Sequence, residues 1–543
     1  MRRGGQPAVV HGRAMSGLKS GVQGAAAIAV AGANDGYNQL RQAFAKPPAS
    51  AKPWVFWYWM HAAVSKEGIT ADLEAMKEVG IGGAYLMPIK DTAHRIPFQP
   101  TARQLSPEWW SLVKFSMQEA KRLGLQLGMH VSDGFALAGG PWITPGISMQ
   151  KLVWTKTYIA DGATEKINLS QPEGKEDYYK DIAVYAYPAV SKAAFSEVVL
   201  VPSVTTSNGI RASFLSFQGS NNQSYKSDSS CWIQYKYPKP FTCRSIRIKT
   251  GGNSYQAHRL SILVSDDGVE FRKYTQLQAP RHGWQDADED VTHAIPEITA
   301  QYFRFVYEKE GSEPGSEDLD AAKWKPSLKV IGIYLSDEPM INQYESKNGS
   351  VWRISETTTK EQVTDAMAIP MKNIVNLTGK MDADGNLDWT APAGNWVIVR
   401  IGHTSTGHTN YTGGAGLGLE VDKFNAKAVK VQFDNWFGKA FSQDAVLAKQ
   451  VLKVFHIDSW ECGSQNWGAN FANEFKKRRG YDLMPYLLVM AGVPVETAAK
   501  SEKVLHDVRT TIAELVNDVF YTTLKNEAHT LGCVVSAEAI APT

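Results

Sequence analysis

A β-α alternation that stops in the middle of the chain and then resumes limits what this sequence can fold into. Short apolar runs, which predict strands, first alternate with amphipathic segments, which predict helices. The predicted strands are 54–60, 82–88 and 125–131, and the predicted helices are 70–79 and 107–122. Pro107 opens the second helix, and Gly80 and Gly124 end the two helices. Such units predict a parallel sheet covered by helices, as in a (β/α)8-type barrel.

The stretch from about residue 156 to 345 has a different period. Apolar runs recur there with turn signals such as Asp267-Gly268 and with almost no helical spacing, which predicts an antiparallel β-sandwich. After Asp422 the β-α alternation returns, with strands expected at 451–458 and 532–538. We therefore expect an α/β fold in which a β-sandwich interrupts the barrel.

A chain of 543 residues is too long to fold around a single hydrophobic core, since such cores stop growing at roughly 250–300 residues. The expected parts are a leader and linker (1–48), the first part of the barrel (49–155), the inserted sandwich (156–345), a strand-rich connecting segment (346–395) and the second part of the barrel (396–543). With 396–402 counted as its fourth strand, the barrel reaches about six of eight strands. We expect it to be incomplete at its C-terminus, so that these residues alone do not form a competent enzyme.

Charge and hydropathy exclude two classes of partner. The net charge of +2 comes from 57 basic and 55 acidic residues in dispersed order. The sequence therefore lacks the basic stripe that is typical of nucleic-acid-binding proteins. No apolar run approaches the roughly 20 residues of a membrane span.

Residues 1–33 are basic, then Ala-rich, and end in a small-residue triplet, which predicts export to the periplasm or medium. Cys231 and Cys243 either pair or stay as buried thiols, and the oligomeric state is open.

Candidate site residues follow from barrel geometry, because barrel active sites lie where the strands end at their carboxyl side. The strand-end candidates are Trp57, His61, His130, Asp133, His403, Asp458, Trp460, Glu461 and Glu538. Carboxylates and aromatic side chains on one rim suit glycoside hydrolysis, which needs an acid and a second carboxylate. Glu461 is the leading acid, since it directly follows an apolar strand and stands beside Trp460.

Structural alternatives remain for several of these residues. Asp458 could be a helix N-cap, and His130 and His403 could be hydrogen-bonded structural residues. The glycine-rich run 413–418 lacks the strand-to-helix context of a dinucleotide site. Two rival functions stay open: a non-catalytic carbohydrate-binding protein, and a metal-dependent barrel hydrolase with His130, Asp133 and His403 as ligands.

Six blocks of sequence resemble glycoside hydrolase family 106, the α-L-rhamnosidases. They are 54–86, 106–113, 123–145, 398–410, 416–423 and 456–487. Residues 228–307 resemble a discoidin-like or galactose-binding-like sandwich. Two departures from the family pattern are His61, where asparagine is expected, and the loop VSDGFALAGG at 131–140.

The resemblance implies an inverting mechanism with two carboxylates, and a calcium ion that contacts sugar hydroxyls. Glu461 looks like the general acid. Glu538 is either the base or a ligand of metal or substrate, and Asp458 and Glu538 are the expected calcium ligands. The substrate-binding candidates are Trp57, His61, His130, Asp133, His403, Asp458 and Trp460. The expected activity is release of terminal rhamnose from plant polysaccharides or glycosides.

Overall fold

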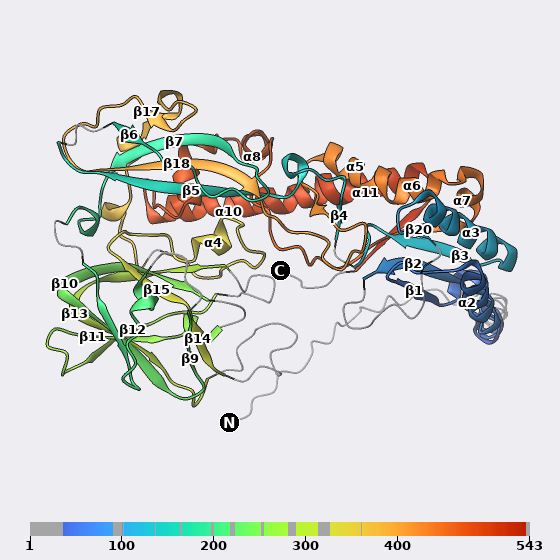
Figure 1. Cartoon of the computed structure of the whole chain (residues 1–543), viewed down its shortest axis with the longest axis horizontal. Coiled ribbons are helices and arrows are strands. Elements are labelled where there is room, and N and C mark those ends of the chain that lie inside the picture. Colours follow the sequence, from blue (N-terminus) through green and yellow to red (C-terminus); the bar gives the residue numbers. More distant parts are fainter. Residues whose placement is uncertain are drawn as a thin grey trace, which may run out of the picture.

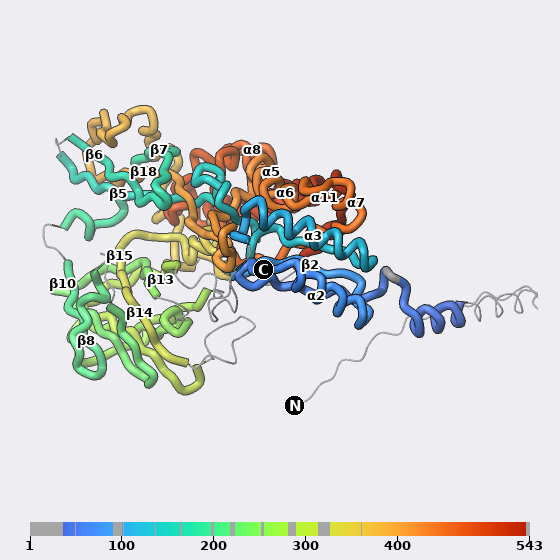
Figure 2. The backbone as a smooth tube through the Cα atoms, turned by 45° about the vertical axis from the view of Figure 1, so that its right-hand side comes forward, coloured from blue at the N-terminus to red at the C-terminus, as the bar shows by residue number. Residues whose placement is uncertain are grey.

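The structure, a computed structural model, separates the chain into a helix-covered parallel sheet, a four-stranded antiparallel sheet and a β-sandwich (Figure 1). The residues that it describes are 36–90, 100, 102–135, 137–162, 166–196, 200–217, 223–250, 255–280, 289–312, 326–359 and 361–538. The predicted export signal at 1–33 lies outside them. Figure 2 shows the sandwich, around β8, β10 and β14, set apart from the parallel sheet.

The parallel sheet has the order β1-β2-β3-β20-β21. Its strands are β1 (Trp54–Met60), β2 (Gly83–Ile89), β3 (Gln126–His130), β20 (Leu452–Ile457) and β21 (Val534–Ala537). These five strands confirm five of the predicted barrel strands. Within the described part of the chain the sheet is open, with β1 and β21 at its edges. A closed barrel is therefore not seen.

Helices cover one face of this sheet. α2 (Lys66–Glu78) begins earlier than predicted, because Ser65 rather than Thr70 caps it by accepting a hydrogen bond from the Gly68 N–H at 3.0 Å. The other helices that flank this sheet are α3 (Pro107–Leu123), α5 (Ala426–Asn435), α6 (Phe437–Ser442), α7 (Ala445–Val451) and α11 (Thr522–Thr530). Their apolar sides and the sheet share one core, which contains Trp59, Trp109 and Phe455.

The predicted fourth barrel strand is wrong. Residues 396–402 lie in β18 (Trp396–Ser405), which belongs to an antiparallel sheet of order β16-β7-β18-β5. β18 pairs with β5 (Gln150–Ile159) and β7 (Lys180–Pro188), and β16 (Val375–Asn376) pairs with β7. One side of β18 packs on α8 (Phe471–Arg479) and α10 (Ala498–Leu515), and the other meets a smaller core around Leu169 and Leu387. β18 is buried along its whole length, so its hydropathy imitates a barrel strand.

The sandwich has a core of its own, which contains Ile233, Phe303 and Phe305. Its larger sheet has the order β12-β11-β13-β10-β15, and β8 also pairs with β10. These strands are β8 (Ser203–Thr206), β10 (Cys231–Lys249), β11 (Ser261–Ser265), β12 (Arg272–Gln276), β13 (Val291–Tyr307) and β15 (Gly332–Ser336). β9 (Tyr225–Ser227) and β14 (Leu328–Val330) form a small second sheet. The predicted sandwich at 156–345 therefore also contains the end of β5 (residues 156–159) and all of β7, which lie in the four-stranded sheet.

Other sequence expectations concern cysteines and membranes. All four cysteines are buried free thiols, and Cys231 and Cys243 lie on the same strand, β10. Among the described residues, no helix combines the length and the apolar character that crossing a bilayer requires. Between β20 and β21 the chain forms α10 (Ala498–Leu515) and α11, which are joined by a π-helical turn at Val516–Tyr521.

Candidate active site

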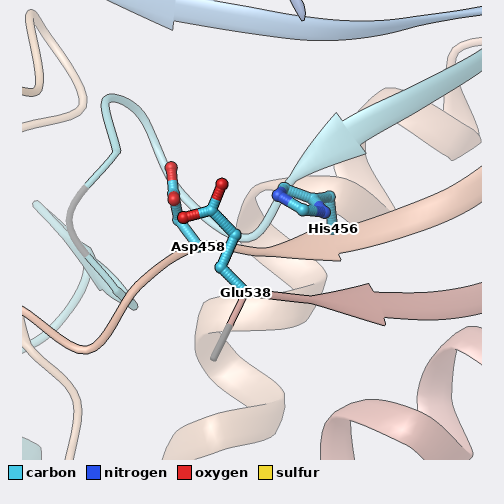
Figure 3. Close-up of side chains that lie close together, drawn as sticks. All are labelled: His456, Asp458 and Glu538. Atoms are coloured by element: carbon cyan, nitrogen blue, oxygen red, sulfur yellow. The ribbon is translucent and has the colours of Figure 1, made fainter. Parts of the chain in front are cut away.

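Two carboxylates meet where β20 and β21 end (Figure 3). Asp458 follows β20, and Glu538 follows β21, where its N–H donates to the carbonyl of Ile457 at 3.0 Å. One ligand atom from each of His456, Asp458 and Glu538 lies within 4.8 Å of the others. The parallel register of β20 and β21 thus brings side chains 80 residues apart in sequence onto one rim.

The surroundings of this pair concentrate negative charge. Burial raises the pKa of Asp458 to about 7, and the nearby Glu538 and Glu461 act in the same direction. The hydrogen bond from the Ser459 N–H to Asp458, at 2.9 Å, opposes this shift only in part. The pKa of Tyr58, on β1, is also raised, mainly by burial and then by Asp458 and Glu538. Such a site favours a bound cation or a retained proton.

The two histidines beside the carboxylates are not cationic. His130 Nδ1 lies 3.4 Å from Asp458 Oδ2, but burial lowers the pKa of His130 to about 3. The contact is therefore not an ion pair at neutral pH. His456 Nδ1 shares a hydrogen bond with Ser536 Oγ at 2.7 Å, and burial lowers its pKa as well. Neither side chain neutralises the carboxylates.

Glu461 lies on the loop that follows β20 and is held by two hydroxyl groups. Ser459 Oγ donates to its Oε1, and Tyr411 Oη donates to its Oε2, both at 2.9 Å. The side chain is partly exposed, so its carboxyl group is open to a ligand as well as oriented. This combination suits proton transfer to a bound substrate.

The glycine-rich run 413–418 holds the loop that carries Tyr411. Asp133 Oδ2 accepts hydrogen bonds from the N–H groups of Gly414 and Gly416 at 2.7 and 2.8 Å, and Asn410 Nδ2 donates to the Asp133 carbonyl at 2.9 Å. A Cβ at residue 416 would lie 2.6 Å from the Asp133 Cβ, so the close approach requires glycine. Burial raises the pKa of Asp133 to about 6. Asp133 therefore supports the Tyr411 loop.

Tyr411 is a site residue that the sequence interpretation missed. It lies one residue beyond the recognised block 398–410, and the neighbouring glycine-rich run was the only local signal. Its contact with Glu461 spans 50 residues of sequence, which no local pattern reports.

We expect Tyr411→Phe to lower kcat about ten-fold while the protein keeps its fold, because one hydrogen bond to a charged group contributes roughly 1.5 kcal/mol. The matched control is Tyr486→Phe, since Tyr486 Oη also donates to a glutamate, Glu496, at 3.1 Å. Steady-state kinetics on a panel of chromogenic aryl glycosides would measure both variants. Equal rates for Tyr411→Phe and the wild type would show that the hydrogen bond does not orient Glu461.

Two of the predicted substrate-binding residues, Trp57 and His403, lie away from the strand-end carboxylates. Trp57 Nε1 donates to Asp72 of α2 at 2.9 Å, so this ring lies on the helix-covered face of the sheet. His403 is on β18, where Nδ1 contacts Gln150 Oε1 at 3.0 Å and burial lowers its pKa to about 4.

Trp460 is buried under the Glu461 loop. Its ring stacks on Trp352 with centroids 4.5 Å apart, and its Nε1 donates to the Gly463 carbonyl at 2.7 Å. These contacts are structural. His61, in contrast, directly follows β1 at the strand-end rim, with φ at 54°.

The three-ligand metal site of the rival hydrolase is not formed. Among the residues that the structure describes, His456, Asp458 and Glu538 are the one group of three or more potential ligands close enough to share an ion. Asp133 instead binds backbone N–H groups, and His403 lies in another sheet. The histidines predicted for that site do not converge with Asp133.

Comparisons with known proteins give a family model, a solved structure and a curated relative. Residues 45–541 match the family model Glyco_hydro_106, described as alpha-L-rhamnosidase. The fold is similar to that of a solved rhamnosidase from Novosphingobium sp. PP1Y, with a TM-score of 0.73 and 28% identity over 92% of this chain and 47% of that one. A curated protein of Formosa agariphila named "Putative beta-glucuronidase" is 28% identical over 501 residues, which are 92% of this chain and 30% of that protein. The chain thus spans less than half of either relative.

Proposed function

We propose, because the chain belongs to glycoside hydrolase family 106, the α-L-rhamnosidases, that it takes part in releasing terminal rhamnose from plant polysaccharides or glycosides. The observation that carries the proposal is Glu461, a partly exposed carboxyl group oriented by two hydroxyls. It lies near the carboxylate pair of Asp458 and Glu538, and glycoside hydrolysis with inversion needs an acid and a base.

In this proposal Glu461 protonates the leaving oxygen, and Ser459 and Tyr411 orient its carboxyl group. Proton donation makes the departing group neutral, which lowers the barrier most for poorly acidic leaving groups. A panel of aryl glycosides, assayed on the natural full-length protein, tests the activity. Turnover of α-L-rhamnosides alone is expected. A protein that binds sugars but turns over none of the panel would instead be a non-catalytic carbohydrate-binding protein.

Asp458 and Glu538 would hold the calcium ion in this proposal. Their adjoining carboxylates fit an oxygen-seeking cation, and burial with mutual repulsion already raises the pKa of Asp458. His456, the third member of the cluster, offers nitrogen, which calcium rarely uses. The ion, when bound, would supply a positive charge that binds and orients sugar hydroxyls. Sugar and water oxygens would then complete the six to eight ligands that calcium takes.

We expect exhaustive chelation to lower both activity and thermal stability, because removing the cation leaves two close carboxylates without compensation. Addition of calcium should restore both, measured by kinetics and by the unfolding midpoint Tm. Restoration by zinc but not by calcium would assign His456 to the ion and contradict the calcium assignment. Unchanged kinetics and Tm after chelation would remove the metal from the proposal.

Glu538 has two candidate roles, cation ligand and catalytic base. Measuring the activity of a Glu538→Gln variant at increasing calcium concentrations separates them. If Glu538 is a cation ligand, Glu538→Gln raises the calcium concentration needed for half-maximal activity, and saturating calcium restores kcat. If it is the catalytic base, kcat stays low at every calcium concentration. We propose the ligand role, because the Glu538 carboxyl group contacts Asp458.

A further inference from the structure

A cleft of about 620 Å³ lies between the sandwich and the four-stranded sheet, outside the strand-end site. One wall is β5, the edge strand of the four-stranded sheet, and the other comes from β10 and β15. Tyr344 and Glu345, on the short helix α4 (Tyr344–Lys347), also line it. The two walls thus belong to different sheets, each with its own core.

The charges in this cleft are largely compensated by one another. On β5, Lys156 pairs with Glu338 at 2.5 Å and Lys151 lies 3.9 Å from Glu289, both across the cleft. In the opposite wall, Arg247 pairs with an aspartate, Asp290, at 2.8 Å. A strongly charged ligand gains little from such a lining. Many donors and acceptors remain, which suits a ligand rich in hydroxyl groups.

Two aromatic rings on β5 face the cleft. Tyr158 is 40% exposed, and its Oη donates to Glu338 Oε1 at 2.8 Å, which fixes the direction of the ring. Trp154, partly buried, packs against Tyr344 with ring centroids 6.0 Å apart. Flat apolar rings beside polar groups are what the apolar faces of sugar rings contact.

The cleft also connects to the loop that carries Glu461. Further along this loop, Asn466 Oδ1 accepts from the N–H of Leu152 at 2.9 Å, and its Nδ2 donates to Ser350 Oγ at 3.2 Å. Leu152 and Ser350 both line the cleft. Asn466 is itself buried, and through it the loop that carries Glu461 is hydrogen-bonded to two residues of the cleft lining.

We infer that this cleft binds an uncharged oligosaccharide chain, with the Tyr158 ring as its main stacking surface. The inference rests on the proposed function and deepens it: the natural substrate is a chain of several sugars, and its non-terminal sugars occupy the cleft. Binding there requires no contact with the strand-end carboxylates, so the two sites can be measured separately.

Titration calorimetry on the Glu461→Gln protein, which prevents turnover, tests this inference with two probes. One is a neutral, rhamnose-terminated oligosaccharide long enough to reach the cleft, and the other is methyl α-L-rhamnoside. We expect Tyr158→Ala to raise the Kd of the oligosaccharide about ten-fold, because one aromatic stacking contact is lost. The Kd of the methyl rhamnoside should stay unchanged. Tyr158→Phe keeps the ring and should retain most of the affinity.

Phe217→Ala is the matched control, because Phe217 is a 61% exposed aromatic residue that does not line the cleft. An oligosaccharide Kd that is unchanged by Tyr158→Ala, or no tighter than that of the methyl rhamnoside, overturns the inference. Equal weakening of both probes would also overturn it, since that indicates damage to the fold. Oligosaccharide binding that depends on Tyr158, without any binding of the methyl rhamnoside, would support the cleft and contradict the rhamnose specificity of the strand-end site.

Discussion

Replacing Glu461 by glutamine is expected to abolish hydrolysis of natural rhamnosides, with a loss of kcat of about 10²–10⁴-fold. The amide has nearly the shape of the carboxyl group and keeps an acceptor for Ser459 or Tyr411. It has no proton to give to the leaving oxygen, so the loss is chemical. Rhamnosides with very acidic phenol leaving groups need little proton donation and should lose far less activity.

The control is Glu496→Gln, because Glu496 also accepts a hydrogen bond from a tyrosine but lies away from the strand ends. It should have wild-type kinetics. Rates measured across a series of leaving groups decide the role of Glu461. A uniform loss, independent of leaving-group acidity, would remove Glu461 from the acid role.

Replacing Lys423 by methionine is expected to cost about 3–5 kcal/mol of the free energy of unfolding. Lys423 Nζ donates to Glu420 Oε2 at 2.7 Å and to the Val421 carbonyl at 3.0 Å, and both charged side chains are 0% exposed. Methionine would leave the Glu420 carboxylate buried without its cation. Lys423 Nζ also lies 5.8 Å from the centre of the Trp460 ring, so the same change should loosen the loop that carries Glu461.

Two further variants separate charge from packing. Glu420→Gln combined with Lys423→Met removes both charges, and we expect it to be more stable than Lys423→Met alone. Lys430→Met breaks surface pairs with Asp434 and Glu527 and should cost less than about 1 kcal/mol. Denaturant unfolding compares the three proteins. Similar costs for Lys423→Met and Lys430→Met would mean that the buried pair does not stabilise the fold.

Local sequence patterns predicted much of the parallel sheet. The strands at 54–60, 82–88, 125–131, 451–458 and 532–538 were recognised because each is a short apolar run bounded by turn or cap residues. Helix α3 followed from Pro107 and Gly124, which mark its two ends. These signals are local, since capping and backbone conformation depend on neighbouring residues.

The same patterns did not reveal which sheet a strand joins. Trp396–Ser405 is buried on both sides by helices and by a second small core, and a strand buried in this way has the same hydropathy as a barrel strand. The sheet that a strand joins depends on its partner strands. For this strand the partners are β5 and β7, which lie more than 200 residues earlier in sequence. The antiparallel sheet was therefore missed.

Sequence alone also predicted that Asp458, Glu461 and Glu538 lie at strand ends, because the strand boundaries are local features. Only the folded chain brings Asp458 beside Glu538, joins Tyr411 to Glu461, and uses Asp133 to hold a loop 281 residues away in sequence. Only the folded chain, too, turns Trp57 toward α2 and buries Trp460 under its own loop. The physical reason is that residue type and periodicity determine local backbone structure, whereas side-chain partners and burial depend on packing between distant segments.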